Sequence, residues 1–210
     1  MRITAVSKSK KGFFSVYVDG AFAFSVDEQT MLEYRLAPQM ETDPQALEHI
    51  RLVAEERYQK ERALKLLGYK SYTKQSLIQR LARDCDEEIA YRVADRMEEL
   101  GLINDEDYAR RYAADLFGIK GYGGRRVLYE LTRKGIPREL AQDVVAELAP
   151  EDDDTVETLI SLIERKYARY LTDRKGIDKT VRALARLGYD YDDIRAAISS
   201  CADLDETYED

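Results

Sequence analysis

The spacing of hydrophobic residues along the chain changes near residue 27. Before this point, residues 3–7 show the two-residue alternation of a β-strand, and the two largely apolar segments 14–18 and 21–26 are also typical of strands. Asp19-Gly20 separates these two segments and is a strong signal for a hairpin turn. Residues 1–26 therefore predict a small antiparallel β meander. We expect it to lie against a helix, because isolated hairpins are only marginally stable.

From Asp27 onward the hydrophobic residues recur every three or four positions, as on one face of an α-helix. Glycines, prolines and capping acids separate the helical segments. They predict three groups of three helices, over 44–67, 73–84 and 86–100, then 105–117, 124–134 and 137–149, then 154–171, 178–187 and 191–200. The middle helix of each group carries an equivalent pair of core residues: Leu77 with Leu81, Val127 with Leu131, and Val181 with Leu184.

This recurrence predicts a mainly α fold with three tandem three-helix repeats, in an elongated, curved array preceded by the β meander. Function is then expected on a long surface rather than in one pocket. The predicted segments are the meander with a short helix (1–43), the three repeats (44–103, 104–149 and 150–201) and an acidic disordered tail (202–210).

The charge of the chain is unevenly distributed. The formal net charge is -8, but residues 149–155 and the segment after Ser199 carry acids without bases. Residues 120–138 and 165–186, by contrast, are rich in Lys and Arg, with Tyr residues among them. Basic residues neutralise phosphates and tyrosine rings stack on bases, so these stretches suit nucleic acid or a nucleoprotein. The alternative is a solvated helix face whose cations pair with acids.

The sequence offers little for catalysis or metal binding. His49 is the only histidine, and Cys85 and Cys201 lack metal-ligand spacing. We therefore expect no enzyme activity, no cofactor and no metal. No apolar run approaches the roughly 20 residues of a transmembrane helix, and the segment after Met1 lacks the apolar stretch of a signal peptide. We expect a cytoplasmic protein with no membrane partner.

Four segments carry a resemblance to a known family. Residues 123–136, GGRRVLYELTRKGI, resemble the signature of the RecX family, with Gly124 in place of the usual proline and Val127 in place of isoleucine. Residues 101–109, GLINDEDYA, look like a second segment of the family, with Asn104 in place of an acid. Residues 17–24, YVDGAFAF, and 63–67, ALKLL, are similar to longer members that carry a β extension. The resemblance covers nearly the whole chain except the acidic tail.

The resemblance implies a monomeric modulator of the RecA recombinase. Such a protein binds the groove of the RecA–DNA filament and inhibits its ATPase and strand-exchange activities, and its contacts with single- and double-stranded DNA belong to the filament. We expect weak binding to DNA alone, because the acidic segments repel it. The residues expected to bind the filament are Arg110, Arg111, Tyr122, Arg125, Arg126 and Lys134 in repeat two, and Lys166, Arg169, Arg174 and Lys175 in repeat three.

Two other functions remain open at the level of sequence. The helix pairs over 73–100 and 124–149 could belong to a helix-turn-helix regulator, which would bind particular duplex sequences without affecting RecA. A helical repeat could also be an adaptor that binds another protein with no nucleic acid involved. The salt dependence of binding distinguishes these two functions. Contacts with DNA phosphates release counterions and make binding salt-dependent, so binding that is insensitive to salt favours the adaptor.

Overall fold

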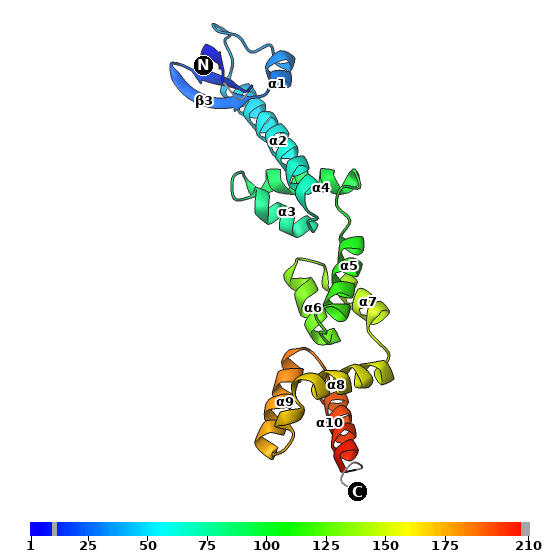
Figure 1. Ribbon diagram of the computed structural model, residues 1–210. Helices are drawn as coiled ribbons and strands as arrows, with labels where there is room; N and C mark the ends of the chain where they lie inside the picture. The colour runs from blue at the N-terminus through cyan, green and yellow to red at the C-terminus, as the bar shows by residue number, and fades with distance from the viewer. Residues whose placement is uncertain (10–11, 207–210) are drawn as a thin grey trace. The chain divides into compact units, whose positions relative to one another are not determined.

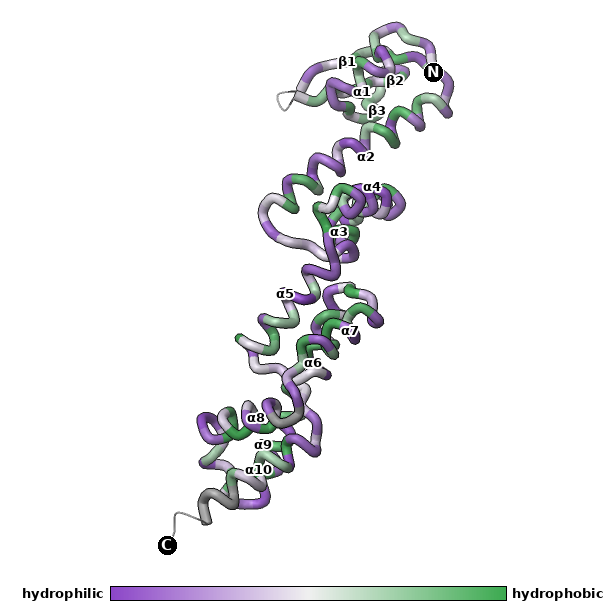
Figure 2. Tube along the Cα trace, turned by 90° about the vertical axis from the view of Figure 1, so that its right-hand side faces the viewer, coloured by the Kyte–Doolittle hydropathy of each residue, from purple (hydrophilic) through white to green (hydrophobic). Residues whose placement is uncertain are grey.

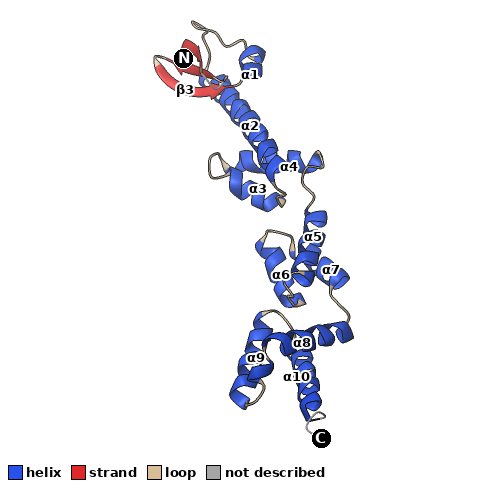
Figure 3. Cartoon of the chain, in the orientation of Figure 1, coloured by secondary structure: helices blue, strands red, loops and turns tan. Residues whose placement is uncertain are grey.

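The computed structural model of this chain describes residues 1–9 and 12–206. The chain divides into two compact units, Met1–Asn104 and Asp105–Asp210. The strands belong to the first unit, and the described part of the second unit is helical (Figure 3). The structure is therefore mainly α with a small antiparallel sheet, as the sequence predicts.

Three strands form the sheet of unit 1: β1 (Ile3–Lys8), β2 (Phe14–Val18) and β3 (Ala21–Val26). They are antiparallel and lie in the order β1-β2-β3. The β2–β3 turn has positive φ at both Asp19 (48°) and Gly20 (88°). A two-residue turn with both φ angles positive matches the twist of the adjoining strands. The predicted meander and its hairpin turn are confirmed.

One face of the sheet packs against helices of the same unit. The core of this part contains Ile3, Val16 and Val26, which meet Leu36 and Ile50. Ile50 lies in α2 (Pro44–Tyr69), and the short helix α1 (Glu28–Glu33) lies between the sheet and α2 in the sequence (Figure 1). The expected helix support for the sheet is thus present.

The second half of α2 packs with α3 (Lys74–Leu81) and α4 (Glu87–Glu99) around Leu77, Leu81 and neighbouring buried residues. The predicted helix 73–84 is shorter at both ends, because Thr73 is the N-cap and the helix ends at Leu81. The Thr73 hydroxyl accepts a hydrogen bond from the amide of Ser76 at 3.1 Å, and the Ser76 hydroxyl accepts one from the amide of Thr73 at 2.9 Å.

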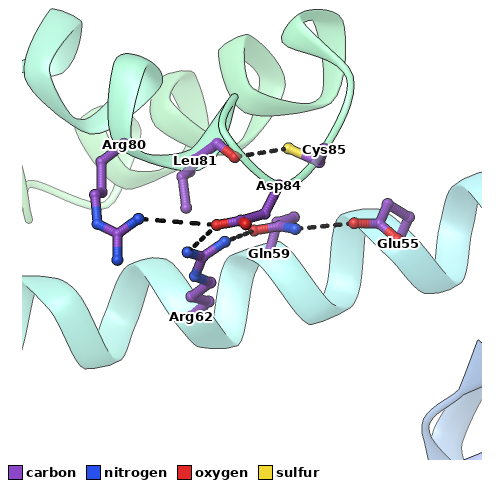
Figure 4. Close-up of polar contacts among 7 residues, drawn as sticks. All are labelled: Glu55, Gln59, Arg62, Arg80, Leu81, Asp84 and Cys85. Carbon is purple, nitrogen blue, oxygen red and sulfur yellow. Dashed lines mark hydrogen bonds and ion pairs between the residues drawn. The ribbon is translucent and has the colours of Figure 1, made fainter.

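A polar network joins α2 to the end of α3 (Figure 4). Gln59 has no exposed surface, and its amide donates to Glu55 Oε1 at 2.8 Å and accepts from Arg62 at 3.4 Å. Arg62 also pairs with Asp84, which lies 3.8 Å from the Arg80 guanidinium. The buried amide is therefore satisfied, as buried polar groups must be.

Unit 2 contains two three-helix groups. The first is α5 (Asp105–Gly118), α6 (Gly124–Arg133) and α7 (Arg138–Leu148), with Val127 and Leu131 fully buried in its core. The second is α8 (Asp152–Lys166), α9 (Arg174–Arg186) and α10 (Tyr191–Glu206), with Leu184 fully buried and Val181 partly buried. The predicted core positions are confirmed in all three repeats.

The third repeat departs from the predicted helix bounds. The helix expected over 154–171 ends at Lys166 and is followed by a separate 3-10 turn, η1 (Ala168–Tyr170). Helix α9 begins at Arg174 rather than at Asp178, because the Asp173 carboxylate caps it by accepting from the Gly176 amide at 2.6 Å. Helix α10 continues to Glu206, into the segment predicted as a disordered tail, and residues 207–210 lie outside the described residues.

Hydrophobic and hydrophilic residues alternate along the helices, including the long α2 (Figure 2). Within residues 1–9 and 12–206, no helix has the length and apolar character needed to cross a membrane.

Candidate functional site

The two repeats of unit 2 meet through an unusually close backbone contact. The Gly123 amide, at the start of α6, donates to the Leu187 carbonyl at 2.9 Å, and Gly188 follows with a φ of +95°. A Cβ atom on Gly123 would lie 2.5 Å from the Gly188 carbonyl carbon, and one on Gly188 would lie 2.3 Å from the Arg126 nitrogen. Only glycine allows this approach at both positions.

Side chains reinforce the same junction. The buried Tyr189 hydroxyl donates to the Gly121 carbonyl at 3.2 Å, and burial raises the pKa of this tyrosine. Arg125 forms an ion pair with Asp190. The start of α6 is therefore attached to the turn between α9 and α10, so repeats two and three form one continuous structure.

A cavity of about 450 Å³ lies beside this junction. Its lining includes Arg125 together with two acids, Asp190 and Asp193. These acids oppose binding of an anion at the start of α6, although no side chain caps this helix.

Arg126 and Tyr122, both predicted to bind the filament, take part in the packing of α6. The Arg126 guanidinium lies 2.6 Å from Glu130 Oε1, and its centre is 5.6 Å from the ring centroid of Tyr122 and 5.2 Å from that of Tyr129. Glu130 is only 4% exposed and also pairs with Arg133 at 3.1 Å. Two arginines compensate this buried carboxylate, which would otherwise be costly to bury.

The other predicted cations of repeat two also have partners in the repeat. Arg110 lies between Glu106 at 2.6 Å and Glu147 at 3.1 Å, so it connects α5 to α7, and these hydrogen bonds raise its pKa. Arg111 pairs with Asp107 at 2.7 Å. The Lys134 ammonium lies 5.5 Å from the ring centroid of Tyr112. Much of the positive charge of repeat two is thus balanced by neighbouring acids.

The predicted cations of repeat three differ from those of repeat two in their ion pairing. Lys166, Arg169, Arg174 and Lys175 are exposed, and none forms an ion pair with an acid among the described residues. Arg169 stacks on Tyr170, with 4.8 Å between the guanidinium centre and the ring centroid. These four side chains are spread over the end of α8, η1 and the first turn of α9.

Sequence reasoning missed three further cations of α9: Lys179, Arg182 and Arg186. Together with Lys175 they are spaced by four, three and four residues, so they share one face of the helix. All are exposed, and none forms an ion pair within the described part of the chain. The helical spacing was visible in the sequence and could have identified them.

The groups considered for catalysis have other roles. His49 shares a hydrogen bond of 3.1 Å with the Tyr34 hydroxyl. The Cys85 thiol donates to the Leu81 carbonyl at 3.4 Å, and burial raises its pKa, which disfavours the nucleophilic thiolate. Among the described residues, no group of three His, Cys, Asp or Glu side chains could hold a metal ion.

Comparison with known proteins finds one family. Two family models match, described as "RecX, second three-helix domain" over residues 104–145 and "RecX, third three-helix domain" over 152–198. The regulatory protein RecX of Clostridioides difficile is 27% identical over 97% of both chains. That of Caldanaerobacter subterraneus is 25% identical over 95% of this chain and 99% of the relative.

Solved structures have the same fold. A crystal structure of a regulatory protein RecX superposes with a TM-score of 0.68 at 23% identity, over 92% of this chain and 97% of that chain. The crystal structure of RecX from Lactobacillus salivarius gives a TM-score of 0.62 at 26% identity, over 70% of this chain and 97% of that one.

Proposed function

This chain belongs to the RecX family, and from that premise we propose that it is a regulator of the RecA recombinase. In this proposal it binds the groove of the RecA–DNA filament and limits ATP hydrolysis and strand exchange. The observation that carries the proposal is similarity to regulatory RecX proteins over nearly the full length of both chains.

The charges of unit 2 support contact with a nucleoprotein. The exposed cations from Lys166 to Arg186 form no ion pair among the described residues, so they can approach phosphates without first breaking one. Three of the predicted cations of repeat two, Arg110, Arg111 and Arg126, are already paired with acids, and the acid-rich segments are expected to repel bare DNA. This combination favours the composite surface of a protein–DNA filament over DNA alone.

The test is hydrolysis of ATP by the cognate RecA on single-stranded DNA while this protein is titrated in. We expect inhibition at well below one copy per RecA, as for a ligand that spans several filament subunits. Unchanged hydrolysis would contradict the proposal. Sequence-selective duplex binding would then favour the helix-turn-helix regulator, and salt-insensitive binding of another protein would favour the adaptor.

Substitutions in the Arg125–Asp190 ion pair can distinguish docking of repeat two on the filament from a purely structural role of this pair. Arg125→Asp removes the exposed cation and the ion pair with Asp190, whereas Arg125→Asp with Asp190→Arg restores the pair in reverse. If Arg125 docks on the filament, the exchanged pair stays defective in inhibition. If it only joins the repeats, the exchange restores inhibition. Arg126 is unsuitable for this purpose, because a second carboxylate beside the buried Glu130 would disrupt α6.

A further inference from the structure

A groove separates η1 from α9 in repeat three. It has a volume of about 380 Å³ and lies between the rings of Tyr167 and Tyr170 and the α9 side chains Lys179, Arg182 and Arg186. Tyr170 is 38% exposed and Tyr167 is half-buried, so both rings present part of their surface to a ligand. Aromatic rings beside cations are the combination that single-stranded nucleic acid requires.

The groove is held in shape by a close backbone contact. A Cβ atom on Gly176 would lie 1.8 Å from the Tyr170 carbonyl oxygen, so η1 rests directly on the first turn of α9. The Asp173 cap fixes the same turn, since its carboxylate accepts from the Gly176 amide. The backbone of Tyr170 is therefore packed directly against the first turn of α9.

Thr180 lines this groove, although its hydroxyl oxygen itself has almost no exposed surface. Its residue is 1% exposed, and its hydroxyl is the buried side-chain oxygen that lacks a hydrogen-bond partner within the described residues. A helical threonine commonly donates to the carbonyl four residues earlier, and Thr180 does not do so. An orphaned buried hydroxyl costs stability, so its presence in a residue that lines a cationic groove points to a ligand with hydrogen-bonding edges.

We propose that this groove binds one unstacked nucleotide of a single-stranded nucleic acid. The base enters between η1 and α9, stacks on the tyrosine rings and exchanges a hydrogen bond with the Thr180 hydroxyl. The phosphates on either side follow the row of α9 cations, Lys175, Lys179, Arg182 and Arg186, which recur about once per helical turn of roughly 5.4 Å. A base in a duplex is already stacked and paired, so the groove selects a single strand.

This site adds to the proposed function, because it names the single-stranded nucleic acid of the filament as the part that repeat three contacts. Its biological setting rests on that proposed function. It is tested without RecA, so either proposal can fail alone. Fluorescence anisotropy at low ionic strength compares a labelled oligothymidylate with an oligomer of equal length made of abasic nucleotides. The two probes carry the same phosphate charge and differ only in the bases.

We expect the oligothymidylate to bind at least about fivefold more tightly than the abasic oligomer, since stacking contributes at this level for each base. Tyr170→Ala should remove most of this difference. Arg182→Glu with Arg186→Glu should weaken binding of both probes at least about tenfold and reduce the slope of log affinity against log salt by roughly 1.4. Thr180→Val should weaken oligothymidylate binding alone.

The matched control is Arg195→Glu on α10, an exposed cation of the same repeat that pairs with Asp192 at 3.8 Å. It should leave binding of both probes unchanged. Equal affinity for the two probes in the wild type would overturn the base site. Equal losses from Arg195→Glu and from a single charge reversal on α9, such as Arg182→Glu, would overturn the assignment of the phosphates to α9.

Discussion

Replacing Gly188 by alanine tests whether the junction of repeats two and three depends on backbone contact. Gly188 has a φ of +95°, and an added Cβ would lie 2.3 Å from the Arg126 backbone nitrogen. Ordinary van der Waals contact begins near 3.4 Å, so more than one ångström of overlap must be relieved. The obstacle is the backbone of α6, which cannot rotate away as a side chain would.

Two costs add in this variant. A left-handed conformation costs alanine about 1–2 kcal/mol, and forcing an extra carbon into packed structure costs about 1–3 kcal/mol. We therefore expect Gly188→Ala to lower the free energy of unfolding by roughly 2–5 kcal/mol. Gly123→Ala would place a Cβ against Gly188 in the same contact, but Gly123 has an ordinary φ of -77°. Its loss of stability should therefore come mainly from packing and not from backbone conformation.

Urea unfolding followed by circular dichroism measures the loss, and hydrogen exchange of the Gly123 amide reports the junction itself, because this amide donates to Leu187. The double variant should lose less than the sum of the single losses, because both substitutions open the same contact. The control is Gly118→Ala, which meets no atom within 4 Å and should be neutral or stabilising. A loss below 1 kcal/mol for Gly188→Ala would refute the reasoning.

Three further outcomes are expected. Glu130→Ala leaves two arginines without their buried partner and should cost about 2–3 kcal/mol in urea unfolding, whereas Glu139→Ala on exposed α7 surface should change stability by less than about 0.5 kcal/mol. Thr180→Val should raise the free energy of unfolding by about 1 kcal/mol, because it removes an unsatisfied buried hydroxyl; a destabilised variant would contradict this. Burial would raise the pKa of Glu56, but hydrogen bonds from Lys60 and Arg92 lower it below its ordinary 4.5. The Glu56 carboxylate therefore stabilises the fold by about 0.5–1 kcal/mol above pH 4.5, and this stabilisation is lost as the pH falls below that value. The free energy of unfolding of Glu56→Gln, measured across this pH range, should depend less on pH than that of the wild type.

The helices of the repeats follow closely from local sequence. Hydrophobic spacing located the buried positions of α3, α6 and α9, since one face of each helix must be apolar wherever it packs. The start of α9 was predicted four residues too late, at 178 instead of Arg174, and Gly176 lies in the part of the helix that was left out. In the structure this glycine lies within α9, where its missing Cβ admits the Tyr170 carbonyl, and Asp173 provides the cap.

The candidate site was only partly predictable. The basic stretches were visible as composition, but the charge state of each surface depends on partners from other elements. Arg110 meets Glu147 of α7, and Arg125 meets Asp190 beyond α9. Nothing in the local sequence indicates these pairs, so repeat two looked as accessible for binding as repeat three.

The sequence by itself determined the mainly helical class, the sheet with its Asp19-Gly20 turn and the buried stripe of each repeat, because periodicity and turn geometry are properties of neighbouring residues. Only the tertiary structure decided that Gly123 and Gly188 touch and which arginines are neutralised. It also placed Tyr170 beside the α9 cations and, within the part of the chain that the structure describes, left the Thr180 hydroxyl without a hydrogen-bond partner. These features arise from contacts between segments distant in the chain, and packing alone selects among the many pairings that the charges permit.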